Sequence, residues 1–248
     1  MPTPYFLNLV STLNLGLLSS PADLEKTCKS LAVLEAIICP EWKNRYCTFE
    51  IINNESLFHL QNEQGDHMCI WFTRHGVLIN GFAMESTMNG WRNKNTQDKY
   101  SVFKLFKMGS SFFELKKHYP MWKGLTDNIP EELHNYIYKE PIKSLGTTFC
   151  IWQANHQNSW QTGNIELPND DIGDGSEELL FLVDGNADTY YIWATEYYDF
   201  QDLQLDCVAL IYQHEPISKE LLYQINSEYV SVDLLKKELD AIEYPHNL

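Results

Sequence analysis

The chain has 248 residues and a formal net charge of −16 at pH 7, with 44% hydrophobic and 13% aromatic residues. This hydrophobic content is enough for a packed core and excludes global disorder. Because like charges repel, the negative charge argues against binding to nucleic acid or to an anionic membrane surface.

The first predicted element is a helix over residues 21–38. Ser20 is placed to cap it, and Pro21 suits the first helical position. Apolar residues recur on one stripe, as at Leu24, Cys28 and Leu31, so we expect one buried face.

Four segments rich in β-forming residues follow, over 45–51, 56–61, 67–73 and 77–84. Turn residues separate them, notably Asn53-Asn54 and Gly65, which predicts an antiparallel meander. The alternation within two of these segments favours one packed face and one wetter face. Two further strands are predicted over 147–154 and 159–167.

The middle of the chain carries a polar loop over 88–101 and a basic, phenylalanine-rich segment over 102–121. The pattern after Pro130 predicts a short helix that ends before Pro141. Further helices are predicted over 176–184, 189–199, 219–226 and 232–242, and their expected caps are, in order, Asp174 or Ser176, Asp188, Ser218 and Ser231. The apolar spacing over 203–212 favours another helix, and a strand is the alternative.

These elements predict an α+β fold with an antiparallel sheet of about six strands, an N-terminal helix and a helical C-terminal third. We expect a single domain over residues 1–248, and 88–121 is the one place where it could divide. The six cysteines show no regular spacing and several lie in apolar runs, which indicates reduced, buried thiols. No segment reads as a signal peptide or a membrane span, so we expect a cytoplasmic protein.

The acidic residues are concentrated in one tract. Residues 144–218 contain no Lys or Arg, and between Lys143 and Lys219 there are 13 acids together with a run of aromatic residues. Such a tract predicts a surface that captures a basic protein partner. The predicted partner-binding residues are Glu166, Asp170, Asp171, Asp174, Glu177, Glu178, Asp188, Tyr191, Glu196, Tyr198, Asp199 and Asp202. An ordinary solvated surface is the alternative interpretation.

Within the aromatic helix, Tyr190, Trp193, Ala194 and Tyr197 share one helical stripe, which favours burial in the core. Residues off this stripe are the better candidates for exposed anchors, because Tyr and Trp dominate binding hot spots. They are Tyr191, Tyr198 and Phe200.

Signatures of catalysis are weak. No nucleotide-binding, hydrolase or Cys/His metal motif is present, and the loop at 170–178 lacks the ligand spacing of a calcium site. We therefore expect no cofactor, metal or catalytic residue. The alternative is an enzyme that uses Asp66, His67 and Glu85 as an acid–base site, and a structural or regulatory subunit is a third hypothesis.

Several short motifs carry a resemblance, and they are 41–46, Gly65-Asp66, 81–86, 122–124, 127–130, 163–168, 174–176 and 190–198. Together they resemble an uncharacterised bacterial protein family. The chain departs from that family at Ala83 and Met84, where its members tend to have an acid and a histidine. The resemblance implies no established activity. By analogy, a small acidic bacterial protein is similar to immunity proteins, which suggests an inhibitor of a toxin or effector.

Overall fold

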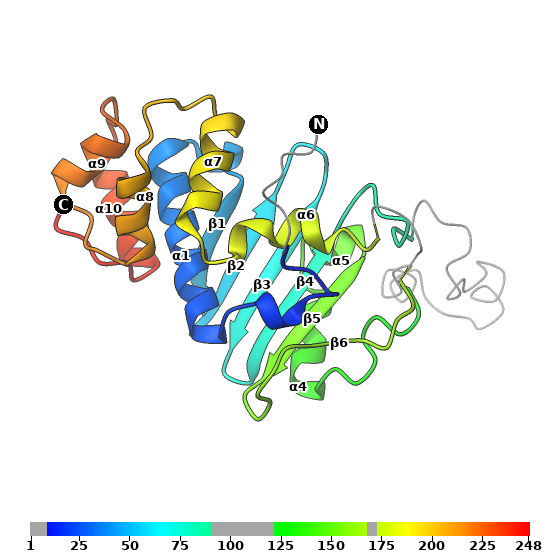
Figure 1. The fold of residues 1–248 in the computed structure, drawn as a ribbon. Helices are drawn as coiled ribbons and strands as arrows, with labels where there is room; N and C mark the ends of the chain where they lie inside the picture. Colours follow the sequence, from blue (N-terminus) through cyan, green and yellow to red (C-terminus); the bar gives the residue numbers. More distant parts are fainter. Residues whose placement is uncertain (1–8, 91–121, 168–172) are drawn as a thin grey trace.

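An antiparallel sheet forms the centre of the computed structural model, which describes residues 9–90, 122–167 and 173–248 (Figure 1). Its strands are β1 (Cys47–Ile52), β2 (Glu55–Gln61), β3 (His67–Thr73), β4 (Gly76–Phe82), β5 (Phe149–Ala154) and β6 (Gln161–Thr162). The six strands lie in sequence order, and each is antiparallel to its neighbour. The predicted α+β class is confirmed.

Tight turns fix the register and decide which loops share an end of the sheet. Asn53 and Asn54 join β1 to β2 with φ values of 54° and 64°. This left-handed conformation is the one that two-residue hairpins need and that Asn tolerates. Ile52 therefore pairs with Glu55. Because every strand reverses direction, the β1–β2 and β3–β4 turns lie at one end of the sheet and the β2–β3 loop lies at the other.

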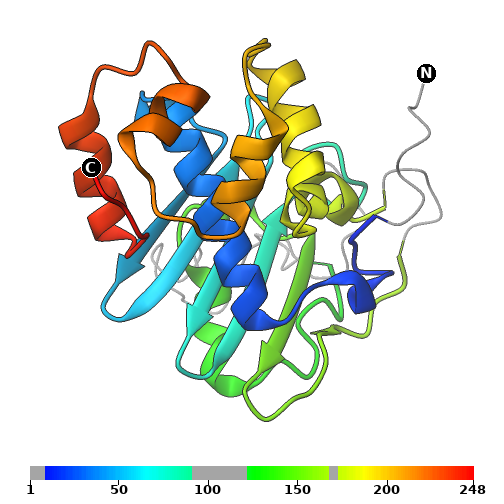
Figure 2. The ribbon, with the colours of Figure 1, turned by 60° about the vertical axis from the view of Figure 1, so that its left-hand side comes forward.

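Helices cover both faces of the sheet (Figures 1 and 2). One face carries α1 (Pro21–Ile38), α6 (Ser176–Leu180), η4 (Phe181–Val183), α7 (Ala187–Tyr197), α8 (Leu205–Tyr212), α9 (Lys219–Ile225) and α10 (Val232–Ala241). The other carries α4 (Glu131–His134), η3 (Asn135–Tyr138) and α5 (Ile142–Leu145). Two short turns of 3-10 helix, η1 (Leu15–Leu17) and η2 (Trp42–Asn44), flank α1 in the chain.

The sheet consequently has a hydrophobic core on each side. Alternate residues of β3 enter different cores, with Ile70 facing the α1 layer and Trp71 facing the α4 layer. Every residue of β4 is buried, so the predicted wetter face is wrong for this strand. Its one polar side chain, Asn80, is buried because it donates to the Ile137 carbonyl at 3.1 Å and accepts from the Thr147 hydroxyl at 3.0 Å.

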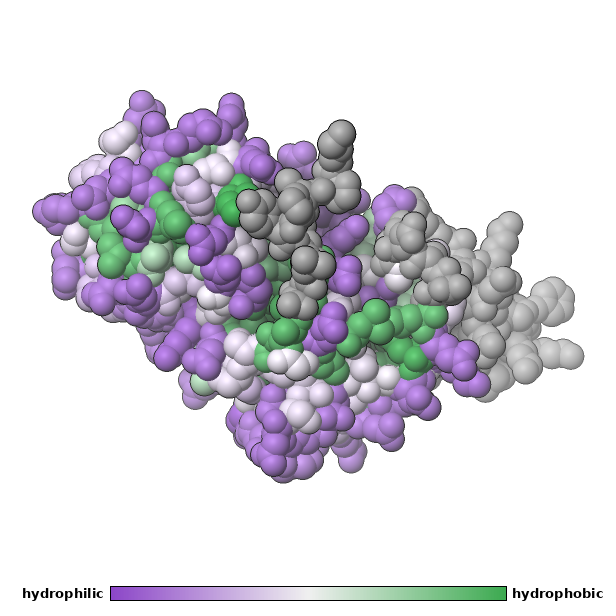
Figure 3. Space-filling view, in the orientation of Figure 1, coloured by the Kyte–Doolittle hydropathy of each residue, from purple (hydrophilic) through white to green (hydrophobic). Residues whose placement is uncertain are grey.

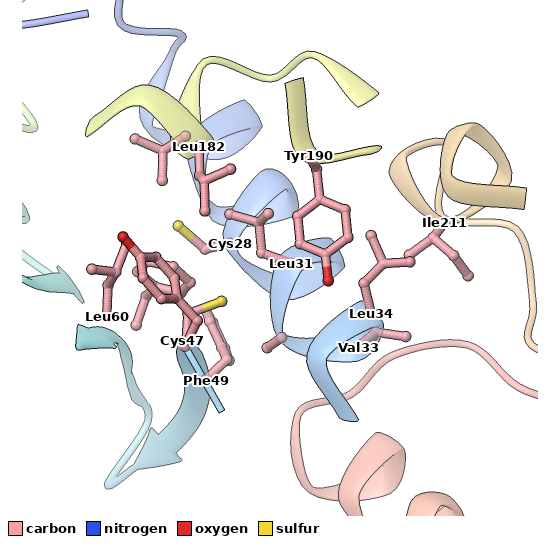
Figure 4. Close-up of a cluster of buried hydrophobic side chains, with 14 of the residues drawn as sticks. Cys28, Leu31, Val33, Leu34, Cys47, Phe49, Leu60, Leu182, Tyr190 and Ile211 are labelled. Atoms are coloured by element: carbon pink, nitrogen blue, oxygen red, sulfur yellow. The ribbon is translucent and has the colours of Figure 1, made fainter. Parts of the chain in front are cut away.

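Helix α1 lies at the centre of the larger core (Figure 4). The structure confirms its predicted bounds, with Pro21 in the first turn and the Ser20 hydroxyl accepting from the Asp23 amide. Leu31 is fully buried between the sheet and the C-terminal helices. Complete burial of one such leucine stabilises the fold by about 1.5–3 kcal/mol.

Several predicted boundaries and caps differ from the structure. The strand expected over 159–167 is only two residues long, because the chain leaves the sheet where Gly163 packs against backbone: an added Cβ would meet the Gly124 carbonyl at 2.1 Å. Helix α7 is capped by Asn186, whose side chain accepts from the Asp188 amide, and not by Asp188 itself. Ser218 caps α9 as predicted, whereas Ser231 forms no side-chain cap.

The remaining expectations concern the thiols, the membrane and the middle segment. All six cysteines are free thiols and all except Cys39 are buried. No described helix combines the length and the apolar character needed to cross a bilayer. The basic segment 102–121 and most of the loop 88–101 lie outside the described residues, and so does most of the predicted subdivision at 88–121.

Candidate functional site

Most of the predicted partner-binding acids lie on the surface. The exposed ones are Glu166, Glu177, Glu178, Asp188, Glu196, Asp199 and Asp202. Hydrophilic residues gather over the helices α7 to α10 in the space-filling view, in keeping with this exposure (Figure 3). Asp170 and Asp171 lie outside the described residues.

Asp174 does not belong to that surface, because it is only 4% exposed. Its carboxylate accepts from the Ser176 amide at 2.9 Å and from the Thr12 hydroxyl at 2.5 Å. A buried carboxylate with two such donors holds the start of α6 against the N-terminal segment. Its role is therefore structural, and the prediction of an exposed binding residue is wrong here.

The predicted aromatic anchors are also placed differently. Tyr198 is half-buried, and its hydroxyl donates inward to Glu35 at 2.6 Å. Tyr191 and Phe200 pack partly against the larger core. Tyr197, which the helical stripe assigned to the core, is 43% exposed. The predicted burial therefore fails at Tyr197, which is the last residue of α7.

Tyr197 is supported from below by other rings. The Trp193 ring stacks on it with centroids 4.8 Å apart and an interplanar angle of 22°. Tyr46, at the entry to β1, lies 4.5 Å from Trp193, measured between ring centroids. Such contacts stabilise side-chain orientation by about 0.5–1.5 kcal/mol for each pair. These contacts hold the partly exposed Tyr197 ring in one orientation at the surface.

Acidic groups from separate parts of the chain lie near the β2–β3 loop. Burial raises the pKa of Glu178, and the negative charges of Asp66, Glu177 and Glu85 raise it further. These charge interactions show that α6, the β2–β3 loop and the segment after β4 lie close together. Burial raises the pKa of Tyr197 as well, with the next contribution from Glu63 in the same β2–β3 loop.

We call this surface the acidic end, and it comprises Glu63, Glu85, Glu177, Glu178, Glu196, Tyr197 and Asp199. These residues lie around the β2–β3 loop, the start of α6 and the end of α7, which share one end of the sheet (Figure 1). Glu63 and Tyr197 were missed as site residues by sequence reasoning. The turn-like sequence around Gly65 was the available signal for Glu63, but nothing in it showed that the loop meets α7.

The acidic tract is not neutralised within the described part of the chain. Between described residues, no Lys or Arg nitrogen lies within 4.0 Å of a carboxylate in residues 173–215. The Lys and Arg ion pairs of the described chain lie elsewhere and join Arg45 to Glu238, Lys43 to Glu41 and Lys143 to Glu140. Uncompensated exposed charges of one sign produce a potential that extends for about 8–10 Å at moderate salt.

A buried carboxylate lies beneath the aromatic residues. Glu35 of α1 is 0% exposed and accepts from the Tyr46 amide at 2.8 Å, the Tyr198 hydroxyl at 2.6 Å and the Tyr190 hydroxyl at 3.0 Å. Burial raises the pKa of Glu35, and the hydrogen bonds partly oppose that effect. This network ties α1, β1 and α7 together and so positions the Trp193–Tyr197 pair. The only sign of this network in the sequence was a glutamate among the apolar residues of the predicted helix over 21–38.

Asp66 and His67, two of the three residues of the enzyme alternative, are hydrogen-bonded to other groups and not directly to each other through their side chains. Asp66 is 5% exposed, and its oxygens accept from the Met84 amide and the Asn62 side chain, each at 2.7 Å. His67 stacks on His59, with Nδ1 of His67 3.1 Å from Nε2 of His59. The Asp66 and His67 side chains, both described, share no hydrogen bond, which a general base and its partner would need directly or through one water.

Comparisons with known proteins add no relative. No protein-family model, no curated protein and no solved structure matches this chain. The functional argument therefore depends on the surface just described.

Proposed function

We propose that this protein binds a basic protein partner through the acidic end and masks that partner's functional surface, as an immunity or inhibitor protein does. The observation that carries the proposal is the lack of positive charge. Glu178 is close enough to Asp66, Glu177 and Glu85 for their charges to raise its pKa, Glu63 acts in the same way on Tyr197, and no described Lys or Arg pairs with the carboxylates of α6 and α7.

The arrangement supports two stages of binding. The negative potential would steer a cationic protein toward the acidic end and raise the association rate, most strongly at low ionic strength. Contact with Tyr197 would then supply an aromatic anchor, and a Lys or Arg of the partner placed over its ring would gain about 0.5–2 kcal/mol. The same potential disfavours nucleic acid as the ligand.

The cellular setting is part of the proposal. Five buried free thiols and one partly exposed thiol suit a reducing compartment, and we place the binding activity in the cytoplasm. The resemblance to an uncharacterised bacterial family supports a partner such as a toxin or effector by analogy only.

The test is affinity capture from a bacterial lysate with matched charge reversals. One bait carries Glu177→Lys and Glu178→Lys, and the control bait carries Asp127→Lys and Glu131→Lys, which are exposed acids on the α4 side of the chain. We expect the wild type and the control to retain the same basic protein at low salt, and the first bait to lose it.

High salt should release the partner from every bait, because screening removes the steering and most of the exposed attraction. If both reversals leave capture of the same protein unchanged, the acidic end is not the docking surface.

A further inference from the structure

A polar cleft of about 730 Å³ lies at the end of the sheet opposite the acidic end. It is formed by the β1–β2 turn, the β3–β4 turn and the α4–η3 segment, which antiparallel pairing brings to the same end. Its size falls within the roughly 300–1,000 Å³ typical of small-molecule sites. Nothing in the proposed binding function uses this cleft.

Two cations line the cleft without a carboxylate partner. Among the residues that the structure describes, neither Arg74 nor Lys139 has a carboxylate oxygen within 4.0 Å. The two cations come from different segments, the β3–β4 turn and the residue after η3, and the fold brings them to one cleft.

Both cations are held in place by their neighbours. The Lys139 ammonium lies 4.1 Å from the Trp71 ring centroid and 4.3 Å from the Tyr136 ring centroid. The Arg74 Nε donates to Nε2 of His75 at 2.9 Å, which leaves the two terminal nitrogens of the guanidinium for a ligand. A planar guanidinium with free terminal nitrogens matches the two oxygens of a carboxylate or phosphate.

Uncharged and acidic groups complete the lining. The side-chain amides of Asn53 and Asn54 have no hydrogen-bond partner in the described structure, and the left-handed turn holds them at the rim. The Glu55 carboxylate is occupied, since it accepts from the Tyr136 hydroxyl. The exposed Glu132 carboxylate lies across the cleft as a further acceptor.

We propose that this cleft binds a small organic anion that carries several hydroxyl groups, such as a sugar phosphate or a sugar acid. The anionic group would lie between Arg74 and Lys139. The amides of Asn53 and Asn54 and the carboxylate of Glu132 would take the hydroxyl groups, because amides and carboxylates accept and orient such donors. A simple inorganic anion would contact only Arg74 and Lys139. A neutral sugar would contact only the two asparagine amides and the Glu132 carboxylate.

The test is titration of the full chain, followed by amide NMR shifts, with glucose 6-phosphate, glucuronate, inorganic phosphate and glucose as probes. We expect a sugar phosphate or sugar acid to shift the amides of Asn53, Arg74 and Lys139 at millimolar concentration or below, more tightly than phosphate or glucose. The stronger of the two anionic sugars identifies the anionic group.

Lys139→Gln should weaken the favoured probe about tenfold or more, as loss of a charged hydrogen bond does. The control Lys143→Gln removes a lysine already paired with Glu140 and should leave binding unchanged. Thermal melts of both variants would check that each keeps the wild-type fold. The proposal is overturned if neither anionic sugar shifts these amides up to about 10 mM, or if both substitutions weaken binding equally.

Discussion

Replacement of Glu35 tests how the buried network positions α7. In Glu35→Ala, the buried Tyr190 hydroxyl and the half-buried Tyr198 hydroxyl lose their acceptor, and the Tyr46 amide keeps only its 3.3 Å hydrogen bond to the Tyr198 oxygen. Each stranded buried donor costs about 1–3 kcal/mol, so the loss is about 2 kcal/mol or more out of a typical 5–15. Glu35→Gln keeps an acceptor oxygen for Tyr46 and Tyr198 without a buried charge, and Tyr190 can turn its hydroxyl to accept from the new amide.

The pKa direction gives the pH dependence of the same comparison. Burial raises the pKa of Glu35 above its ordinary 4.5, so the folded protein holds this proton more tightly than the unfolded chain does. Stability from this residue is therefore complete below pH 4.5 and falls as the pH rises through the folded pKa. Relative to Glu35→Gln, the wild type should lose stability as the pH rises above 4.5.

Urea unfolding followed by tryptophan fluorescence measures both effects, with exposed Glu228→Gln as the control. We expect Glu35→Ala to unfold at clearly lower urea than Glu35→Gln at every pH, and Glu228→Gln to follow the wild type. Equal stability of the Ala and Gln variants would refute the argument from stranded donors. A wild type that gains stability over Glu35→Gln as the pH rises would refute the assigned pKa direction.

Two further predictions concern other buried groups. Burial, with a smaller contribution from the neighbouring His67, lowers the pKa of His59 to about 4. Stability from His59 is therefore present above pH 6.5 and is lost as the pH falls toward 4. His59→Gln should flatten that part of the urea midpoint–pH curve, and an unchanged slope would contradict this prediction. Asp174→Ala removes the acceptor of the Ser176 amide and of the Thr12 hydroxyl. It should lower the free energy of unfolding in urea by about 1–3 kcal/mol and leave partner capture intact. Loss of capture without loss of stability would show that Asp174 belongs to the docking surface.

Local signals in the sequence were enough for most of the fold. The Ser20-Pro21 start and the apolar stripe defined α1, and Asn53-Asn54 defined a hairpin, because caps and tight turns depend on a few adjacent residues. The short β6 could not be predicted in this way. Its end depends on Gly163 meeting the backbone of Gly124, a contact between segments far apart in the chain.

The sequence predicted that the candidate site is acidic, but it did not predict which residues form it. The lack of Lys and Arg over 144–218 is visible in the sequence, and it indicated which tract carries the charge. Which acids face solvent depends on tertiary contacts: Asp174 turns inward to Thr12, and Glu63 joins the surface because its loop meets α7. The Glu35 network likewise joins α1, β1 and α7, so no single segment contains its pattern.

The negative potential of the acidic end can be measured without knowing the partner. Amide relaxation enhancement by a cationic and by an anionic nitroxide reports the potential near each residue. We expect the cationic probe to be strongly enriched over the anionic one at Glu63, Glu177 and Tyr197, and the enrichment to fall as salt is added. A cationic-to-anionic ratio at these residues no higher than the average over the molecule would contradict the claim that this end presents a field for a basic partner.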